Sequence, residues 1–303
     1  MSNDIFNPSS FFVETPMVDQ LKTQIQSWLW NGFLGGYILG NSRAGKSAAI
    51  RAIRNQLQNR HGQQIPVHLF SVPERDVTTV AGVFKKLCYS LRMKIETRAT
   101  ADVMSNDLVH YFADLACTND TKQVVIIVDE MQRLSIQQIE VFNELHDALA
   151  NFKLNLSVIF VGNIKTSEPI LKKIKTPQCD HIWGRFFKNE YLFHGIRNQN
   201  ELSLVLGEID KTQTGIFLPK EFQSGWRVES ISHLIWDIYI KDFKSDLKIH
   251  SWGMQYFIAM IRILLADYLP MYGIKNEKEI RIMVQNCIEA SGLVEDLVRV
   301  YEC

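Results

Sequence analysis

The chain has 303 residues and a formal net charge of zero. This length fits two compact units, or one large domain with a lid. A zero net charge gives no overall attraction to nucleic acid or to a membrane surface, so any DNA contact requires a local basic patch. The cysteines form no CxxC pair and no Cys/His cluster, which argues against a zinc site or a disulfide framework.

Neither the first residues nor the most apolar late stretch has the pattern of a membrane segment. The start, MSNDIFNPSS, lacks the basic stretch and apolar run of a signal peptide. The most apolar late stretch, Trp252–Leu269, contains Arg262 and Asp267, which is typical of a buried helix rather than of a membrane span. We therefore expect a cytoplasmic protein without a membrane partner.

Apolar runs and helical patterns alternate through the first two thirds of the chain, after an amphipathic helix over Pro16–Trp30. The runs predict strands at Gly36–Gly40, Pro66–Val72, Val124–Asp129, Leu156–Gly162 and, more briefly, Glu190–Phe193. The patterns between them predict helices at Lys46–Arg60, Val77–Lys94, Ala101–Cys117, Ser135–Phe152 and Lys165–Lys175. This order predicts an α/β fold with a parallel sheet and helices on both faces.

The strand signals fade after Gly195, and only helical patterns follow. They lie at Gln199–Thr212, Ser230–Phe243, Trp252–Tyr268, Glu277–Ser291 and Val294–Val300. We predict a boundary near Gly195–Asn198. Residues 1–195 would form a nucleotide-binding core with an N-terminal helix, and residues 196–303 a helical lid with further C-terminal helices.

The strongest motif is GNSRAGKS, which follows an apolar strand and opens a helix, the context expected for a phosphate-binding P-loop. Its glycines let backbone N–H groups approach phosphates closely. Lys46 would reach the β- and γ-phosphates, and the helix N-terminus would add partial positive charge. The predicted ATP-binding residues are Gly40, Asn41, Ser42, Arg43, Ala44, Gly45, Lys46 and Ser47.

A second motif, VVIIVDE, ends an apolar strand with two carboxylates. At the carboxyl end of that strand, Asp129 would hold a water bound to Mg²⁺, and Ser47 would ligate the same ion. Glu130 is then placed to act as the general base on the water that attacks the γ-phosphate. A strand that ends in a polar turn is the alternative, which a preceding P-loop disfavours.

Two further residues are candidates for catalysis. Asn163 ends the strand LSVIFVGN, and it would bond the γ-phosphate or the attacking water if this strand neighbours the P-loop strand. Asn is also a common turn residue after strands. Arg185 in WGRFF would act as an arginine finger on a neighbour's ATP if subunits form a ring. Alternatively, it is a surface or packing residue.

Positive charge also gathers after the second predicted strand, where threonines add hydrogen-bonding groups. Contacts of this kind to phosphates position a protein on DNA without reading its sequence. The alternative is an ordinary solvated helix face. The DNA-binding candidates are Arg75, Thr78, Thr79, Lys94, Arg98 and Thr100.

The order of these motifs resembles that of AAA+ ATPases, P-loop NTPases with a helical lid. The sequence is more specifically similar to the TnsC/TniB group of bacterial DNA-transposition ATPases, including those of CRISPR-associated transposons. The likeness spans roughly residues 15–265. It rests on GNSRAGKS, on FKKL at Phe84–Leu87, on VVIIVDEMQRL, on VIFVGN and on GRF at Gly184–Phe186.

The resemblance implies a function. Such proteins assemble on duplex DNA as ATP-dependent rings or helical filaments, and they connect a TniQ-type target selector to the transposase. ATP hydrolysis with Mg²⁺ would control the assembly, Arg185 would complete a neighbour's site, and the segment Arg75–Thr100 would face DNA.

One departure from the family concerns the lid, and two other functions stay open. AAA+ lids often carry a sensor arginine early in a helix, but the stretch here reads WGMQYF, and Arg262 comes later. The alternatives are a nucleotide-gated scaffold with little turnover, or another AAA+ machine such as a DNA-remodelling ATPase, a secretion-associated ATPase or an initiator-type clamp loader.

Overall fold

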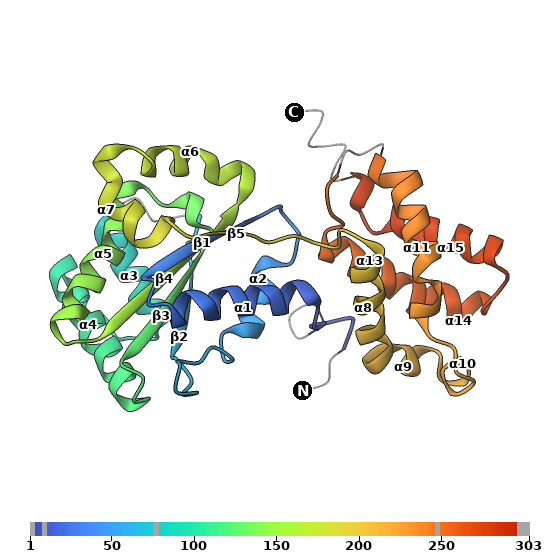
Figure 1. The fold of residues 1–303 in the computed structure, drawn as a ribbon, viewed down its shortest axis with the longest axis horizontal. Helices are drawn as coiled ribbons and strands as arrows, with labels where there is room; N and C mark the ends of the chain where they lie inside the picture. The colour runs from blue at the N-terminus through green and yellow to red at the C-terminus, as the bar shows by residue number, and fades with distance from the viewer. Residues whose placement is uncertain (1–3, 8–10, 75–78, 246–248, 296–303) are drawn as a thin grey trace. The chain divides into compact units, whose positions relative to one another are not determined.

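The computed structural model describes residues 4–7, 11–74, 79–245 and 249–295 (Figure 1). The chain forms two compact units. One, the helical unit, comprises Met1–Asp19, Ser42–Gly45 and His194–Cys303; the other, the sheet unit, comprises Gln20–Asn41 and Lys46–Phe193. Across the described part of the chain, no helix is long and apolar enough to cross a bilayer.

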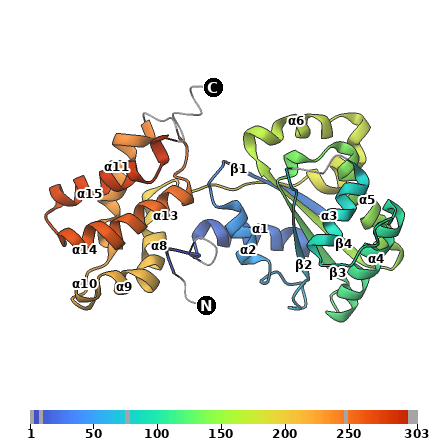
Figure 2. The same ribbon diagram turned by 180° about the vertical axis from the view of Figure 1, so that it is seen from behind.

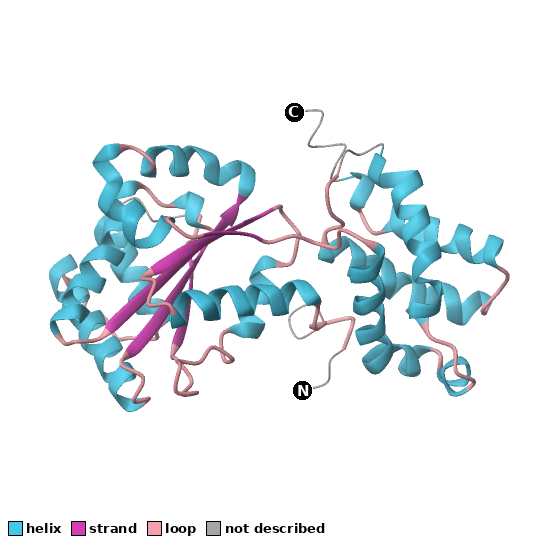
Figure 3. Cartoon of the chain, viewed as in Figure 1, coloured by secondary structure: helices cyan, strands magenta, loops and turns pink. Residues whose placement is uncertain are grey.

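The sheet unit is built on five parallel strands in the order β2-β3-β4-β1-β5 (Figure 3). The strands are β1 (Gly35–Gly40), β2 (Val67–Ser71), β3 (Gln123–Asp129), β4 (Asn155–Asn163) and β5 (Glu190–Leu192). Strand β1 is buried throughout, as are the central residues of β3 and β4, which explains their unbroken apolar sequences. The predicted parallel sheet is confirmed.

Helices cover both faces of this sheet (Figures 1 and 2). One face carries α3 (Val80–Ser90), α4 (Ala101–Thr118) and α5 (Ile136–Asn151), and the other carries α1 (Pro16–Trp30) and α2 (Lys46–Ile53). Helix α1 comes so close that a Cβ at Gly36 would lie 2.6 Å from the ring of Trp28. After β4 follow α6 (Ile164–Ile174), α7 (Asp180–Ile182) and the π-helical turn η3 (Trp183–Phe187).

Two predicted helices are shorter than their sequence patterns. Helix α2 ends at Ile53 rather than at Arg60, because residues 54–64 form a turn in which the Asn59 side chain accepts hydrogen bonds from the N–H groups of His61 and Gln63. Helix α3 ends at Ser90 rather than at Lys94. Helix ends depend on such local side-chain bonds, which hydrophobic periodicity does not register.

The helical unit packs its helices around buried aromatic rings. Tyr239 and Trp252 stack with centroids 4.3 Å apart, and Phe257 meets Trp252 edge to face. Three long patterns predicted as single helices each change into a π-helical turn. The bounds are α8 (Gln199–Ile209), η4 (Asp210–Thr214), α9 (Gly215–Phe217), α10 (Pro219–Gln223), η5 (Val228–Ile231), α11 (Ser232–Ile238), η6 (Tyr239–Lys244), α13 (Met254–Ile263), η7 (Leu264–Tyr268), α14 (Leu269–Tyr272) and α15 (Glu277–Ala290).

The last predicted helix, Val294–Val300, lies mostly outside the described residues.

Candidate nucleotide-binding site

The two ends of the P-loop are set by β1 and α2 in the sheet unit. Gly40 is the last residue of β1, and Lys46 and Ser47 open α2. A Cβ at Gly40 would lie 2.6 Å from the carbonyl oxygen of Phe193, so only glycine fits where the loop leaves the strand. A glycine at this position adds no Cβ to the backbone, as close approach to phosphate oxygens requires.

The ammonium group of Lys46 is held against the loop that precedes it. Nζ donates to the carbonyl oxygens of Gly40 and Asn41, each at 2.8 Å. Burial lowers the pKa of Lys46 below its ordinary value, while the carboxylates of Asp129 and Glu130 act in the opposite direction. The lysine therefore lies beside the loop, and both carboxylates act on its charge.

The tip of the loop, Ser42–Gly45, packs within the helical unit. The N–H of Gln255 donates to the carbonyl oxygen of Arg43 at 3.2 Å, and the Arg43 guanidinium lies 5.2 Å from the centroid of the Tyr256 ring. Arg43 and Gly45 both have positive φ, 62° and 100°. Within the helical unit, the start of α13, where the sequence lacks a sensor arginine, thus contacts Arg43 through Gln255 and Tyr256, which the sequence alone did not indicate.

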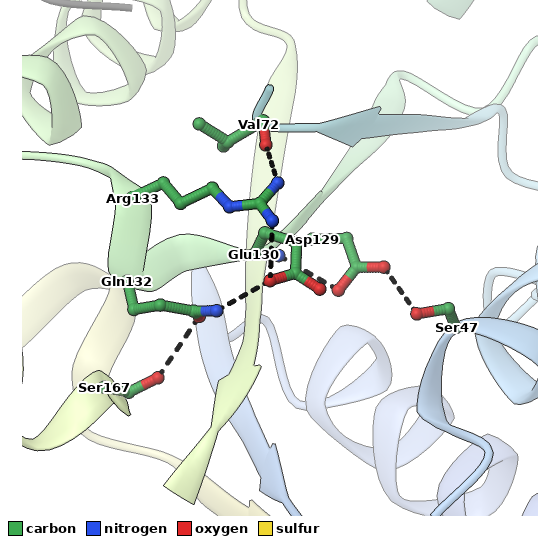
Figure 4. Close-up of polar contacts among 7 residues, drawn as sticks. All are labelled: Ser47, Val72, Asp129, Glu130, Gln132, Arg133 and Ser167. Atoms are coloured by element: carbon green, nitrogen blue, oxygen red, sulfur yellow. Dashed lines mark hydrogen bonds and ion pairs between the residues drawn. The ribbon is translucent and has the colours of Figure 1, made fainter. Parts of the chain in front are cut away.

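Ser47 and Asp129 meet as the Mg²⁺ prediction requires. Ser47 Oγ donates to Asp129 Oδ2 at 2.7 Å, and the other carboxylate oxygen accepts from the N–H of Glu130 at 3.0 Å (Figure 4). Among the described residues, no group of three or more His, Cys, Asp or Glu side chains is arranged to hold a metal ion. Mg²⁺ needs few protein ligands when phosphates and water complete its shell, so this hydroxyl and carboxylate fit it.

Glu130 follows directly after β3, in the left-handed conformation with φ 63° and ψ 42°. Its carboxylate contacts Gln132 and Arg133, which lie in the next turn, η1 (Met131–Arg133). Neither of these two residues was predicted to belong to the site. Both belong to the DEMQRL stretch, where their positions two and three residues after Glu130 could have indicated a contact with its carboxylate.

Asn163 lies opposite Gly40 in the register of β4 with β1, so the strand of Asn163 does neighbour the P-loop strand. Its side-chain oxygen accepts from the N–H groups of Lys165 and Thr166 at 2.9 and 3.3 Å, and so it caps the start of α6. The cap fixes the side chain at the same edge of the sheet as Gly40. The predicted contact with phosphate or water stays a prediction.

Arg185 is presented by η3, whose phenylalanines are buried. Phe186 and Phe187 are fully buried and lie against Phe160 of β4, with centroid distances of 5.9 and 4.8 Å. The Arg185 guanidinium pairs with Asp147 of α5 at 2.8 Å and holds the pKa of that carboxyl below its usual range. Arg185 thus lies near the surface, and its partner is a residue of its own chain.

The six DNA-binding candidates have different environments. Thr79 and Thr100 are helix N-caps, because their hydroxyl oxygens accept from the N–H groups of Gly82 and Val103. Lys94 and Arg98 are exposed in the connection between α3 and α4. Arg75 and Thr78 lie outside the described residues. The two threonines therefore have a structural role whether or not they also contact DNA.

Comparisons with known proteins agree with this geometry. The model of the AAA domain family matches residues 34–169, from just before β1 into α6. No curated protein sequence matches the chain.

Solved structures with a similar fold include Cdc6p from Pyrobaculum aerophilum, at 16% identity and a TM-score of 0.55, covering 86% of this chain and 64% of that one. They also include Drosophila ORC bound to DNA, at 17% identity and a TM-score of 0.56, covering 89% of this chain and 66% of that one. The chain thus spans less than two thirds of the length of either structure. Residues 34–169 therefore carry an AAA domain, and the fold of the chain is that of a P-loop AAA+ protein.

Proposed function

We propose that this protein is an Mg²⁺-dependent ATPase whose nucleotide state controls its assembly on duplex DNA. The observation that carries the proposal is the 2.7 Å contact of Ser47 with Asp129 beside Lys46 and Glu130. It brings together, on one edge of the sheet, a phosphate ligand, a hydroxyl that can ligate Mg²⁺, a carboxylate that can hold an Mg²⁺-bound water and a second carboxylate that can accept a proton from water. Bound Mg²⁺ would neutralise charge that develops on the phosphates.

The chain's own groups would divide the work of hydrolysis. Lys46 and the loop backbone bind the phosphates, and Glu130 accepts the proton of the attacking water. Asn163, at the carboxyl end of the neighbouring strand, orients the γ-phosphate or that water. Arg185 completes the site of an adjacent subunit, where its charge stabilises the transition state.

We propose, more specifically, that the protein regulates DNA transposition, and that the assembled protein links a TniQ-type target selector to a transposase. Support comes from the sequence resemblance to the TnsC/TniB group and from the exposed Lys94 and Arg98. A structure of similar fold, Drosophila ORC, is bound to DNA. A ring or helical filament on duplex DNA is the assembly that this role requires.

The decisive variant is Glu130→Gln, which keeps the size of the side chain but removes the base. We expect it to abolish ATP hydrolysis and to keep or strengthen ATP-dependent assembly on duplex DNA, measured by phosphate release and by electron microscopy. Glu168→Gln makes the same chemical change on the exposed surface of α6 and should behave as wild type. Normal hydrolysis by Glu130→Gln would show that Glu130 is not the base.

Mixed assemblies test the role of Arg185 across subunits. Arg185→Ala subunits keep an intact base, and Glu130→Gln subunits keep the arginine. If Arg185 acts in a neighbour's site, a mixture of the two variants should hydrolyse more ATP than either variant alone. A mixture no more active than the separate variants would contradict action between subunits.

A second candidate function is that of an initiator-type ATPase, and the fold similarity to Cdc6p and ORC favours it. Both functions include ATP-dependent DNA binding, so binding alone does not separate them. Stimulation of turnover by a transposase and a TniQ-type protein would support the role in transposition. Sequence-specific binding to a replication origin, without a response to those partners, would support the role of an initiator.

A further inference from the structure

The chain turns sharply at Glu130, so the next turn folds back over its carboxylate. The left-handed conformation of Glu130 is uncommon outside glycine, Asn and Asp. It starts the single turn η1, and this brings the side chains at the second and third positions after Glu130 back towards it. A conformation that is unfavourable for Glu is therefore maintained where it determines the direction of the predicted base.

Two side chains hold the same oxygen of that carboxylate. Gln132 Nε2 donates to Glu130 Oε2 at 2.7 Å, and Arg133 Nη2 lies 3.8 Å from Oε2 (Figure 4). Within the described parts of the chain, Glu130 Oε1 has no hydrogen-bond or ion-pair partner. One oxygen is thus engaged by the protein, and the other is left to accept a proton.

Both holding side chains are themselves fixed from outside the turn. Arg133 Nη1 donates to the carbonyl oxygen of Val72, the buried residue that follows β2, at 2.8 Å. Gln132 Oε1 accepts a long hydrogen bond from Ser167 Oγ of α6 at 3.5 Å, and Ser167 is fully buried. The orientation of Glu130 is therefore connected to the segments that follow β2 and β4.

Gly162 on β4 leaves the space that this arrangement needs. A Cβ at this position would lie 2.2 Å from Ser167 Oγ and 3.1 Å from Gln132 Oε1. The half-buried Gln132 amide therefore contacts Glu130 through its nitrogen and Ser167 through its oxygen, beside the strand, and these contacts limit its orientation. Because the Gln132 amide has a limited orientation, its hydrogen bond can limit the orientation of the Glu130 carboxylate.

We propose that Gln132 and Arg133 are positioning residues for hydrolysis: they hold Glu130 by Oε2 so that Oε1 faces the attacking water. This inference rests on the proposed function, in which Glu130 is the base. Neither residue belongs to the P-loop, so their loss changes the orientation of the base and leaves the phosphate contacts in place. Misplacement of a reacting group by about 1 Å can cost about 100-fold in rate.

The test is steady-state ATP hydrolysis by the full chain, with Mg²⁺ and duplex DNA, for the variant Gln132→Ala. We expect kcat to fall about 10- to 100-fold, while KM for ATP and the binding of a non-hydrolysable ATP analogue stay within about 2-fold of wild type. Gln132→Glu is nearly isosteric, but it lacks the donor and places a second carboxylate against Glu130. It should lower kcat at least as far.

Controls separate positioning from a general structural effect. Gln137→Ala makes the same change at an exposed position of α5 and should leave kcat unchanged. Arg133→Lys keeps the positive charge and should retain more activity than Arg133→Ala. In a Glu130→Gln background, where no base is left to position, Gln132→Ala should leave the binding of the ATP analogue unchanged.

The outcomes distinguish this inference from the proposed function. If wild type and Gln137→Ala hydrolyse ATP, Glu130→Gln does not, and both Gln132 variants match wild type, the positioning role is overturned and the ATPase stands. A parallel loss of analogue binding and of kcat in both Gln132 variants also overturns it, since that indicates a structural defect. If wild type shows no turnover with DNA and partners, the proposed function and this inference fail together.

Discussion

The packing of Phe187, which lies in η3 two residues after Arg185, gives a prediction with a defined magnitude. Phe187 is fully buried, and its ring stacks on Phe160 at 4.8 Å and lies 5.6 Å from the ring of Tyr37. Replacement by alanine removes both ring contacts and leaves a cavity between η3 and the sheet. Truncations of this kind cost about 3–5 kcal/mol of the free energy of unfolding.

Urea denaturation monitored by circular dichroism measures this cost, and ATP hydrolysis measures its effect on the site. Leu192→Ala is the matched control, because Leu192 lies on β5 with 51% of its surface exposed, and it should change stability by about 0.5 kcal/mol or less. Arg185→Ala should lower turnover with little change in stability, since exposed ion pairs contribute about 0–1 kcal/mol. A Phe187→Ala cost below about 1 kcal/mol would refute the packing argument.

Three further predictions concern single side chains. Asp147→Asn removes the partner that Arg185 has in its own chain, which should free Arg185 for the neighbour's site and raise DNA-stimulated ATP turnover. Unchanged or lower turnover would show that this ion pair does not compete with the neighbour's site. Burial lowers the pKa of His68 to about 4, so between pH 6.5 and 4 the unfolded chain binds a proton that the folded chain does not. As the pH is lowered over that interval, the free energy of unfolding of the wild type should therefore fall by up to about 3 kcal/mol more than that of the variant His68→Gln. Urea denaturation of both proteins at several pH values measures this difference. Tyr239→Phe removes a buried hydroxyl that has no partner within the described residues, so thermal denaturation should show equal or higher stability, and a loss above about 1 kcal/mol would reveal a partner.

The strands and the first helix could be predicted closely from the sequence, because burial on two faces demands unbroken apolar runs. Helix α1 has the predicted bounds, and each predicted strand matches the observed one within about a residue at either end. Polar residues at the ends of these runs then indicate the edge that carries the candidate site, since parallel strands bring their carboxyl ends together. Gly40, Asp129 and Asn163 lie at that edge for this reason.

The partners of the site residues could not be predicted, because they depend on side-chain directions rather than on periodicity. Nothing in the sequence places Asp147 against Arg185, which lies on a different element. The π-helical turns were missed for a related reason: a π turn changes the helical repeat locally without changing the apolar composition. A basic segment likewise does not show which of its polar groups cap helices, as Thr79 and Thr100 do.

Lys46, Glu130 and Arg185 share a property that bears on the proposed coupling to assembly. Each contacts groups of its own chain: loop carbonyls for Lys46, Gln132 and Arg133 for Glu130, and Asp147 for Arg185. For Lys46 and Arg185, action on ATP means exchanging those contacts for phosphate oxygens, so the net gain is the difference between two sets of bonds. In the proposed mechanism, Glu130 keeps its contacts on one oxygen and acts through the other. Under that proposal, ATP binding involves an exchange at Lys46 within one subunit, and turnover involves an exchange at Arg185 that needs a second subunit. Hydrolysis would then be a consequence of assembly.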